Sequence, residues 1–159
     1  MEIGEIQKRL EESFCAAVGP VVEGRLCNYV EVDADAIDRA AEFLRNEAAT
    51  AFDCLSNLSG ADYPEKGHIQ IVYDLYSYEH DHSVVIKVNA DRETPKVNTV
   101  ESVWPAANWL EREVWDMYGI RFAGHPDLKR ILMYEGFEGH PLRKDYPVNK
   151  RQPLIGPMN

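Results

Sequence analysis

Two alternating apolar segments, joined by a short polar connection, constrain the fold of this 159-residue chain more than any other feature. Every second residue is apolar in both segments, at Ile69, Ile71, Tyr73 and Leu75 and again at Val84, Ile86 and Val88. Successive side chains of a strand point to opposite faces, so each segment predicts a strand with one buried face. The connection SYEHDHS at residues 77–83 is short, which favours antiparallel pairing.

Two helices are predicted before this hairpin. Apolar residues recur at helical spacing from Ile3 onward, and Gly19 with Pro20 should stop the first helix. Residues 33–49 repeat this spacing, and Asp33 or Asp35 is expected to cap the second helix.

Residues 27–33 alternate and predict a strand, whereas residues 51–62 are a weaker strand candidate that ends in turn residues. The order of elements predicts an α+β fold, with a mixed or antiparallel sheet, helices over one face and an extended C-terminal tail.

A third helix is predicted at residues 104–118, with a broad apolar face. Glu111 falls inside that face, and a buried carboxylate must be paired or protonated. We expect a structural role, in which Glu111 binds a basic residue downstream of the turn at Gly119. The candidates are Arg121, Lys129, Arg130 and Arg143.

The opposite face of this helix carries Arg112 and Asp116, four residues apart, which are expected to form a solvated pair of small energetic value. Trp109 lies on the same polar side. It either contacts a partner protein or packs under a local loop, because Trp and Arg are residue types that anchor interfaces.

Composition excludes several function classes. Residues 1–124 carry a net charge of −12 and residues 125–159 a net charge of +2, and an acidic body disfavours binding to nucleic acid or to anionic lipid. No apolar run is long enough to cross a bilayer and the N-terminus is unlike a signal peptide, so the chain is expected to stay in the cytosol.

The metal-ligating residue types are sparse. Cys15, Cys27 and Cys54 are widely spaced and are expected to be buried, reduced thiols, not cluster or zinc ligands. His80 and His82 have a ligand spacing, H-x-H, but in a polar turn they are expected to be solvated. His125 and His140 each precede a proline and are expected to be hydrogen-bonding turn residues.

The C-terminal segment, residues 125–159, contains five prolines and no sustained period, and only RILMY at residues 130–134 could pair as a strand. Its composition is not that of a disordered chain, yet it cannot form a core of its own. We therefore expect residues 1–124 to fold alone and residues 125–159 to lie along another protein, mobile from about residue 139 until the partner binds.

The sequence EREVWDMYGIRFAGHPDLKRIL at residues 111–132, continued by EGFEGHPLRKDYP at 135–147, resembles the signature of a known family. That family is the C subunit of the proton-pumping NADH:quinone oxidoreductase, respiratory complex I, and the resemblance is dense over about residues 103–147.

The resemblance implies a non-catalytic assembly subunit of the hydrophilic arm, peripheral on the cytoplasmic side of the plasma membrane and reaching the membrane only through the complex. FMN, iron–sulfur clusters and quinone would belong to other polypeptides. The chain would contact two of them, the D subunit, which resembles the large subunit of hydrogenases, and the cluster-bearing B subunit. Tyr118 and Gly119, like Glu111, are expected to be structural. The expected interface residues are Trp109, Arg112, Glu113, Asp116, His125, Lys129, Arg130, His140, Arg143, Lys144 and Asp145.

Two alternatives remain open from the sequence. The chain could be the equivalent subunit of a membrane-bound hydrogenase or of another ferredoxin- or F420-linked complex. It could also be a stand-alone metal-dependent hydrolase that uses its histidines and Glu111, which requires these groups to converge in a pocket.

Overall fold

The fold was analysed in a computed structural model, which describes residues 1–150 and 152. A five-stranded mixed sheet forms its centre, with the strand order β1-β2-β5-β4-β3. Strands β2 and β5 pair in parallel and the other neighbours are antiparallel. The strands are β1 (Val18–Val22), β2 (Tyr29–Val32), β3 (Cys54–Tyr63), β4 (His68–Ser77) and β5 (His82–Asp91).

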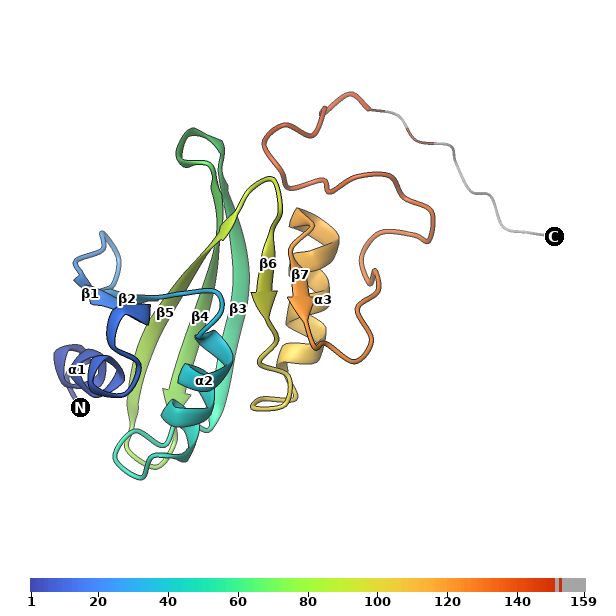
Figure 1. The fold of residues 1–159 in the computed structure, drawn as a ribbon. Helices are drawn as coiled ribbons and strands as arrows, with labels where there is room; N and C mark the ends of the chain where they lie inside the picture. Colours follow the sequence, from blue (N-terminus) through green and yellow to red (C-terminus); the bar gives the residue numbers. More distant parts are fainter. Residues whose placement is uncertain (151, 153–159) are drawn as a thin grey trace.

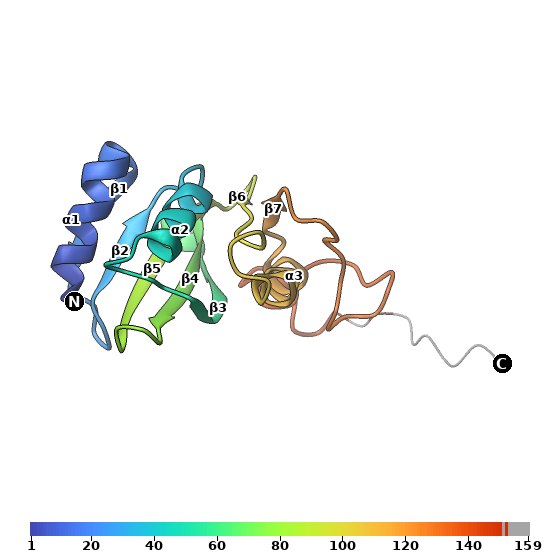
Figure 2. The same ribbon diagram turned by 90° about the horizontal axis from the view of Figure 1, so that it is seen from below.

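Helices α1 (Ile3–Phe14) and α2 (Ile37–Asn46) lie on one side of the sheet, while α3 (Ala107–Tyr118) lies beyond β3 at the other end of the molecule (Figures 1 and 2). A second, parallel pair of short strands, β6 (Lys96–Asn98) and β7 (Arg121–Ala123), flanks α3. The predicted α+β class and the mixed sheet are thus confirmed.

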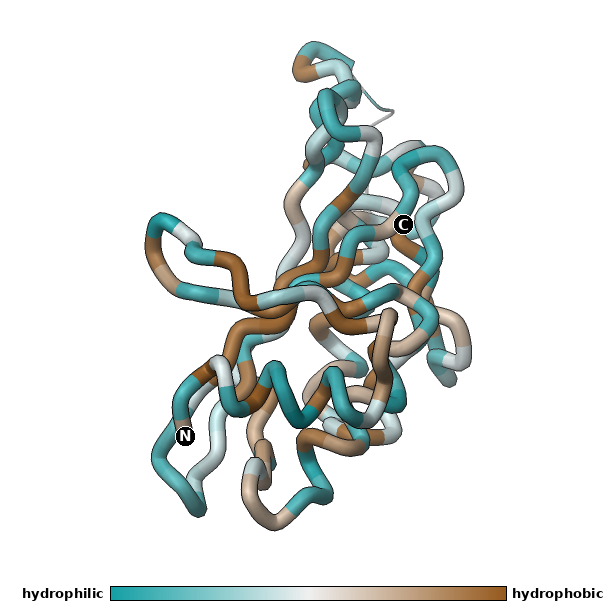
Figure 3. The backbone as a smooth tube through the Cα atoms, turned by 60° about the vertical axis from the view of Figure 1, so that its left-hand side comes forward, coloured by the Kyte–Doolittle hydropathy of each residue, from teal (hydrophilic) through white to brown (hydrophobic). Residues whose placement is uncertain are grey.

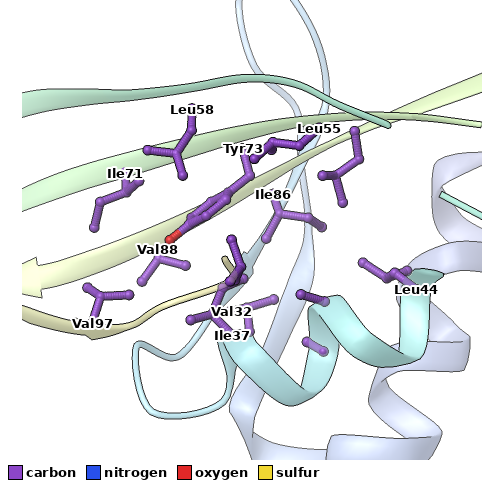
Figure 4. Close-up of a cluster of buried hydrophobic side chains, with 14 of the residues drawn as sticks. Val32, Ile37, Leu44, Leu55, Leu58, Ile71, Tyr73, Ile86, Val88 and Val97 are labelled. Atoms are coloured by element: carbon purple, nitrogen blue, oxygen red, sulfur yellow. The ribbon is translucent and has the colours of Figure 1, made fainter. Parts of the chain in front are cut away.

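The alternating segments form the core of the molecule. Tyr73 pairs with Ile86 and Ile71 with Val88 across the β4–β5 hairpin, and all four side chains are buried. Figure 4 shows Ile37 and Leu44 of α2 directed toward this cluster, and Figure 3 shows the apolar residues concentrated along the central strands. Burying side chains of this size stabilises the fold by roughly 1.5–3 kcal/mol each.

The first helix does not end where the sequence predicted. It stops at Phe14, and Gly19 and Pro20 lie inside β1, which the sequence did not predict. Since β1 is at the edge of the sheet, the missing N–H of Pro20 is tolerated there.

The weak strand candidate at residues 51–62 is confirmed as strand β3, which pairs with β4 along its whole length and is longer than expected. Two further local predictions were wrong. No side chain caps α2, which begins after Ala36 and not at Asp33 or Asp35. Cys15 and Cys27 are exposed free thiols instead of buried ones, since they lie at a helix end and in a loop, and Cys54 is half-buried.

The C-terminal segment forms no helix or strand between residues 124 and 150. It passes around α3 and returns toward the connection between β5 and β6 (Figure 1). The predicted strand at residues 130–134 is absent because its backbone N–H groups bind a side chain of α3 instead of another strand. The part of the tail prediction that concerns residues 151 and 153–159 lies outside the described residues.

Candidate partner-binding surface

Glu111 lies on the inner face of α3 and has no solvent exposure, as the spacing predicted. Its Oε1 accepts a hydrogen bond of 2.8 Å from the Val100 amide, and its Oε2 accepts one of 2.5 Å from the Thr99 hydroxyl. The prediction that a downstream cation neutralises it was wrong. The loop before α3 folds back over the helix and supplies the donors, a contact that helical spacing cannot reveal.

The environment of Glu111 favours its protonated form. Burial raises the pKa of Glu111 to about 7, although the hydrogen bonds from Thr99 and Val100 oppose the increase. The buried Tyr73 hydroxyl, whose own pKa is raised by burial and then by Glu111, has no hydrogen-bond partner among residues 1–150 and 152. The apolar core therefore encloses two polar groups, of which Glu111 accepts two hydrogen bonds and the Tyr73 hydroxyl forms none with the described residues.

Asp116 is also fully buried, so the predicted solvated pair with Arg112 is wrong. Asp116 Oδ2 accepts hydrogen bonds from three consecutive backbone amides, at 3.1 Å from Ile131, 2.9 Å from Leu132 and 2.9 Å from Met133. Its Oδ1 lies 2.5 Å from Nη1 of Arg130. The face of α3 that would be solvated in isolation is covered by the chain's own C-terminal segment.

These contacts decide the charge state of Asp116. Its burial would raise its pKa, but hydrogen bonds from the backbone amides of Met133 and Leu132, and from Arg130, outweigh that cost and leave its pKa below the ordinary value. Asp116 is therefore an ionised internal anchor, and no surface of its side chain is left for a partner protein.

Arg112 and Trp109 form a preorganised pair at the surface. Arg112 is only 7% exposed, its Nε donates to the Lys129 carbonyl at 3.1 Å, and its guanidinium lies 4.8 Å from the Trp109 ring centroid. Trp109 remains 63% exposed, so it does not pack under a loop of the described chain. A large aromatic side chain held in place by a cation is a typical interface anchor.

The turn at the end of α3 joins the helix to the C-terminal segment. Gly119 has a φ of 83°, and a Cβ placed there would lie 2.7 Å from the His140 ring. The ring of Tyr118 covers Gly60 of β3 with similar closeness. His140 Nδ1 donates to the Asp116 carbonyl at 3.0 Å, and the Leu142 amide donates to the Met117 carbonyl at 3.1 Å.

Tyr118 and Gly119 thus make close contacts within the chain, and their structural roles stay a prediction. The expectation that the chain is mobile from about residue 139 without a partner stays a prediction, and against it stand the hydrogen bonds of His140, Arg143 and Lys144 to the body.

The remaining predicted interface residues divide by exposure. Glu113, Lys129, Lys144 and Asp145 are exposed, and Lys129 forms an ion pair with Asp127 at 2.7 Å. His125, Arg130, His140 and Arg143 are partly buried and bind their own chain. The exposed group can contact a partner directly, whereas the buried group shapes the surface.

Two residues that support this surface were missed by sequence reasoning. Asp62 of β3 and Arg92, which follows β5, form a bidentate ion pair with N–O distances of 2.8 and 3.1 Å. Neither belongs to a motif, and 29 residues separate them in the sequence. No pattern in the sequence would have singled them out, because their contacts join segments that are far apart in the chain.

The histidines do not converge on a catalytic or metal site. His80 and His82 bind the carbonyls of Ala48 and Thr50, on the loop after α2, while His125 binds the carbonyl of Asn108, as predicted for a turn residue. Within residues 1–150 and 152, no group of three or more His, Cys, Asp and Glu side chains is placed to hold a metal ion. No helix in this described part has the length and apolarity needed to cross a membrane.

Comparisons with known proteins support one relationship. Residues 30–152 match the family described as "Respiratory-chain NADH dehydrogenase, 30 Kd subunit". The chain is 51% identical over 117 residues to the second NADH-quinone oxidoreductase C subunit of Rhizobium meliloti (strain 1021), which covers 73% of this chain and 64% of that protein. It is 43% identical over 148 residues to the C subunit of Methylorubrum extorquens (strain PA1), covering 89% and 66%. The chain thus spans just under two thirds of the length of these relatives.

Two solved structures share the fold. A chain of the membrane-bound sulfane sulfur reductase (MBS), an archaeal respiratory membrane complex, has a TM-score of 0.72 at 27% identity, with 93% of this chain and 88% of that one covered. The trypsin-resistant fragment (1-134) of Nqo5 has a TM-score of 0.61 at 30% identity, with coverage of 77% and 98%.

Proposed function

Because this chain belongs to the family of the 30 kDa subunit of respiratory-chain NADH dehydrogenases, we propose that it is a non-catalytic docking subunit of an NADH–quinone oxidoreductase. In this role it supports electron transfer from NADH to quinone, coupled to proton translocation, by holding neighbouring subunits together. FMN, iron–sulfur clusters and quinone are bound by those neighbours.

The distribution of exposed apolar side chains carries the proposal. Eight large hydrophobic residues are exposed in the described chain, and five of them belong to α3 or to the segment after it. These five are Trp109, Leu132, Tyr134, Leu142 and Val148. Exposed apolar side chains that form one patch among polar groups are typical of a protein-binding surface, and we infer that these five contribute to one.

Charge favours a partner with acidic groups around an apolar contact. The exposed side chains of Lys129, Lys144 and Lys150 accompany the apolar residues, while the rest of the molecule is acidic. We assign this surface to the hydrogenase-like D subunit, with the cluster-bearing B subunit as a second neighbour. The chain then lies on the cytoplasmic side of the plasma membrane and reaches the membrane only through the complex.

One specific observation favours a second candidate. The similarity to a chain of the membrane-bound sulfane sulfur reductase extends over 93% of this chain. The second candidate is therefore the equivalent subunit of another respiratory membrane complex, such as a membrane-bound hydrogenase or a ferredoxin- or F420-linked complex, which would use the same surface with a different electron donor.

Native affinity purification of the tagged full chain tests the proposal and separates the two candidates. We expect the other subunits of an NADH–quinone oxidoreductase to co-purify. Trp109→Ala should weaken their recovery by about tenfold or more, the loss of an aromatic anchor worth about 2 kcal/mol. Leu26→Ala, at a 97% exposed residue outside the surface, is the matched control and should change nothing. Recovery of the chain alone, or NADH-independent turnover by the isolated chain, would refute the proposal.

A further inference from the structure

The C-terminal segment is attached to the body at a second point, distant in sequence from α3. The Lys144 amide donates to Asp62 Oδ2 at 2.8 Å, and Asp145 Oδ1 lies 3.0 Å from Nη2 of Arg92. Arg143 closes the network, because its Nη2 donates to the Arg92 carbonyl at 2.8 Å. Three consecutive residues of the segment therefore bind one ion pair of the body.

Because this ion pair is buried, its charged groups need several hydrogen bonds from the protein. The Asp62 side chain has no exposure and that of Arg92 has 12%. A buried carboxylate needs several donors, and Asp62 obtains two from Arg92 and the third from the backbone of the C-terminal segment. The hydrogen bond from Arg92, ahead of the opposing effect of burial, holds the pKa of Asp62 below its ordinary value, so the network stays ionised at neutral pH.

The segment is attached to the body without using the side chains of Leu142 and Lys144, which stay available to a partner protein. Lys144 binds through its backbone amide while its side chain remains exposed, and Leu142 nearby is 50% exposed. The network therefore fixes the path of the backbone and leaves these two side chains directed to solvent.

We propose that Asp62 and Arg92 form a clamp that sets the partner-binding shape of residues 142–146 before a partner arrives. The inference rests on the proposed function and deepens it. A segment that is already ordered loses less conformational entropy on association, so the clamp strengthens binding without contacting the partner. Arg92 and Asp62 are thus positioning residues of the docking surface.

Amide hydrogen exchange on the full chain tests the clamp without any partner. Asp145→Asn removes the ion pairs that Asp145 forms with Arg92 and Arg143, and it leaves the Asp62–Arg92 pair intact. We expect the Lys144 and Tyr146 amides to exchange at least about fivefold faster, while amides of β4 and β5 are unchanged. Asp127→Asn, which removes the exposed ion pair with Lys129, is the matched control. Unchanged exchange at Lys144 in Asp145→Asn would overturn the clamp.

Binding to the separately purified D subunit of the same complex gives the functional readout. Arg92→Gln should lower the affinity about tenfold although the residue is too buried to contact the partner, and Arg92→Lys should restore part of it. Should Arg92→Gln fail to fold, the smaller loss of affinity expected for Arg92→Lys supplies the comparison. Equal affinity of folded clamp variants and wild type would overturn the inference. Absence of binding by the wild-type chain would refute the assignment of the partner, and the exchange result would still decide the clamp.

Discussion

Glu111→Gln offers the most informative single change, because glutamine has the shape of the protonated acid and cannot ionise. Its carbonyl can accept from the Val100 amide, and its amide group can donate to the Thr99 hydroxyl, so both contacts of Glu111 survive. The variant therefore removes the ionisation of a buried group while it keeps the packing.

The magnitude follows from the raised pKa of Glu111. This pKa is about 7 in the folded chain against an ordinary value of 4.5. Below about pH 4.5 Glu111 is protonated in both states and costs nothing. Between these two values the unfolded chain ionises first, so stability falls as pH rises, by about 1.4 kcal/mol for each pH unit. Above about pH 7 the full cost, about 3 kcal/mol, has been reached.

Urea unfolding followed by tryptophan fluorescence at about pH 5, 6, 7 and 8 measures this effect. Glu111→Gln should exceed the stability of wild type by less than about 1 kcal/mol near pH 5 and by up to about 3 kcal/mol at pH 8. The difference between the two proteins cancels the titration of other groups. Glu113→Gln, an exposed neighbour on the same helix, should show no such difference. A Glu111→Gln protein that is less stable than wild type at pH 8 would refute the reasoning.

Further substitutions test the contacts around α3, each by urea unfolding at neutral pH. Asp116→Asn should cost about 2 kcal/mol, because the charged acceptor of three amides and of Arg130 is lost, and an unchanged midpoint would contradict the anchor role. Gly119→Ala should cost about 1–2 kcal/mol, since its φ of 83° strains any side chain and the new Cβ meets the His140 ring. Gly60→Val should cost about 1–3 kcal/mol by displacing the Tyr118 ring, and stability equal to wild type would show that the ring moves freely.

The spacing of apolar residues was sufficient to predict those helices and strands that bury one face in the main hydrophobic core. The alternation in β4 and β5 and the spacing in α2 predicted both the elements and their buried faces, as the burial of Tyr73 and Leu44 shows. Short or irregular elements could not be predicted in this way. Strand β1 contains Gly19 and Pro20, and β6 and β7 have three residues each, so only their tertiary partners define them as strands.

The candidate surface shows the same division. Helical spacing correctly placed Glu111 inside, but it placed Asp116 outside because the spacing of a helix contains no information about what the later chain covers. The C-terminal segment converts that polar face into a second interior. Asp62 and Arg92 had no sequence signal, since their role arises where segments far apart in the chain meet.

Site-specific photo-crosslinking in the native complex tests whether α3 and the segment after it face another subunit. A photoreactive amino acid replaces Trp109 on the proposed surface or Lys8 on α1, both exposed positions, in the full chain. We expect a crosslink from position 109 to another subunit of an NADH–quinone oxidoreductase, and none of comparable yield from position 8. Crosslinks from position 8 alone, or none from position 109 in the assembled complex, would contradict this expectation.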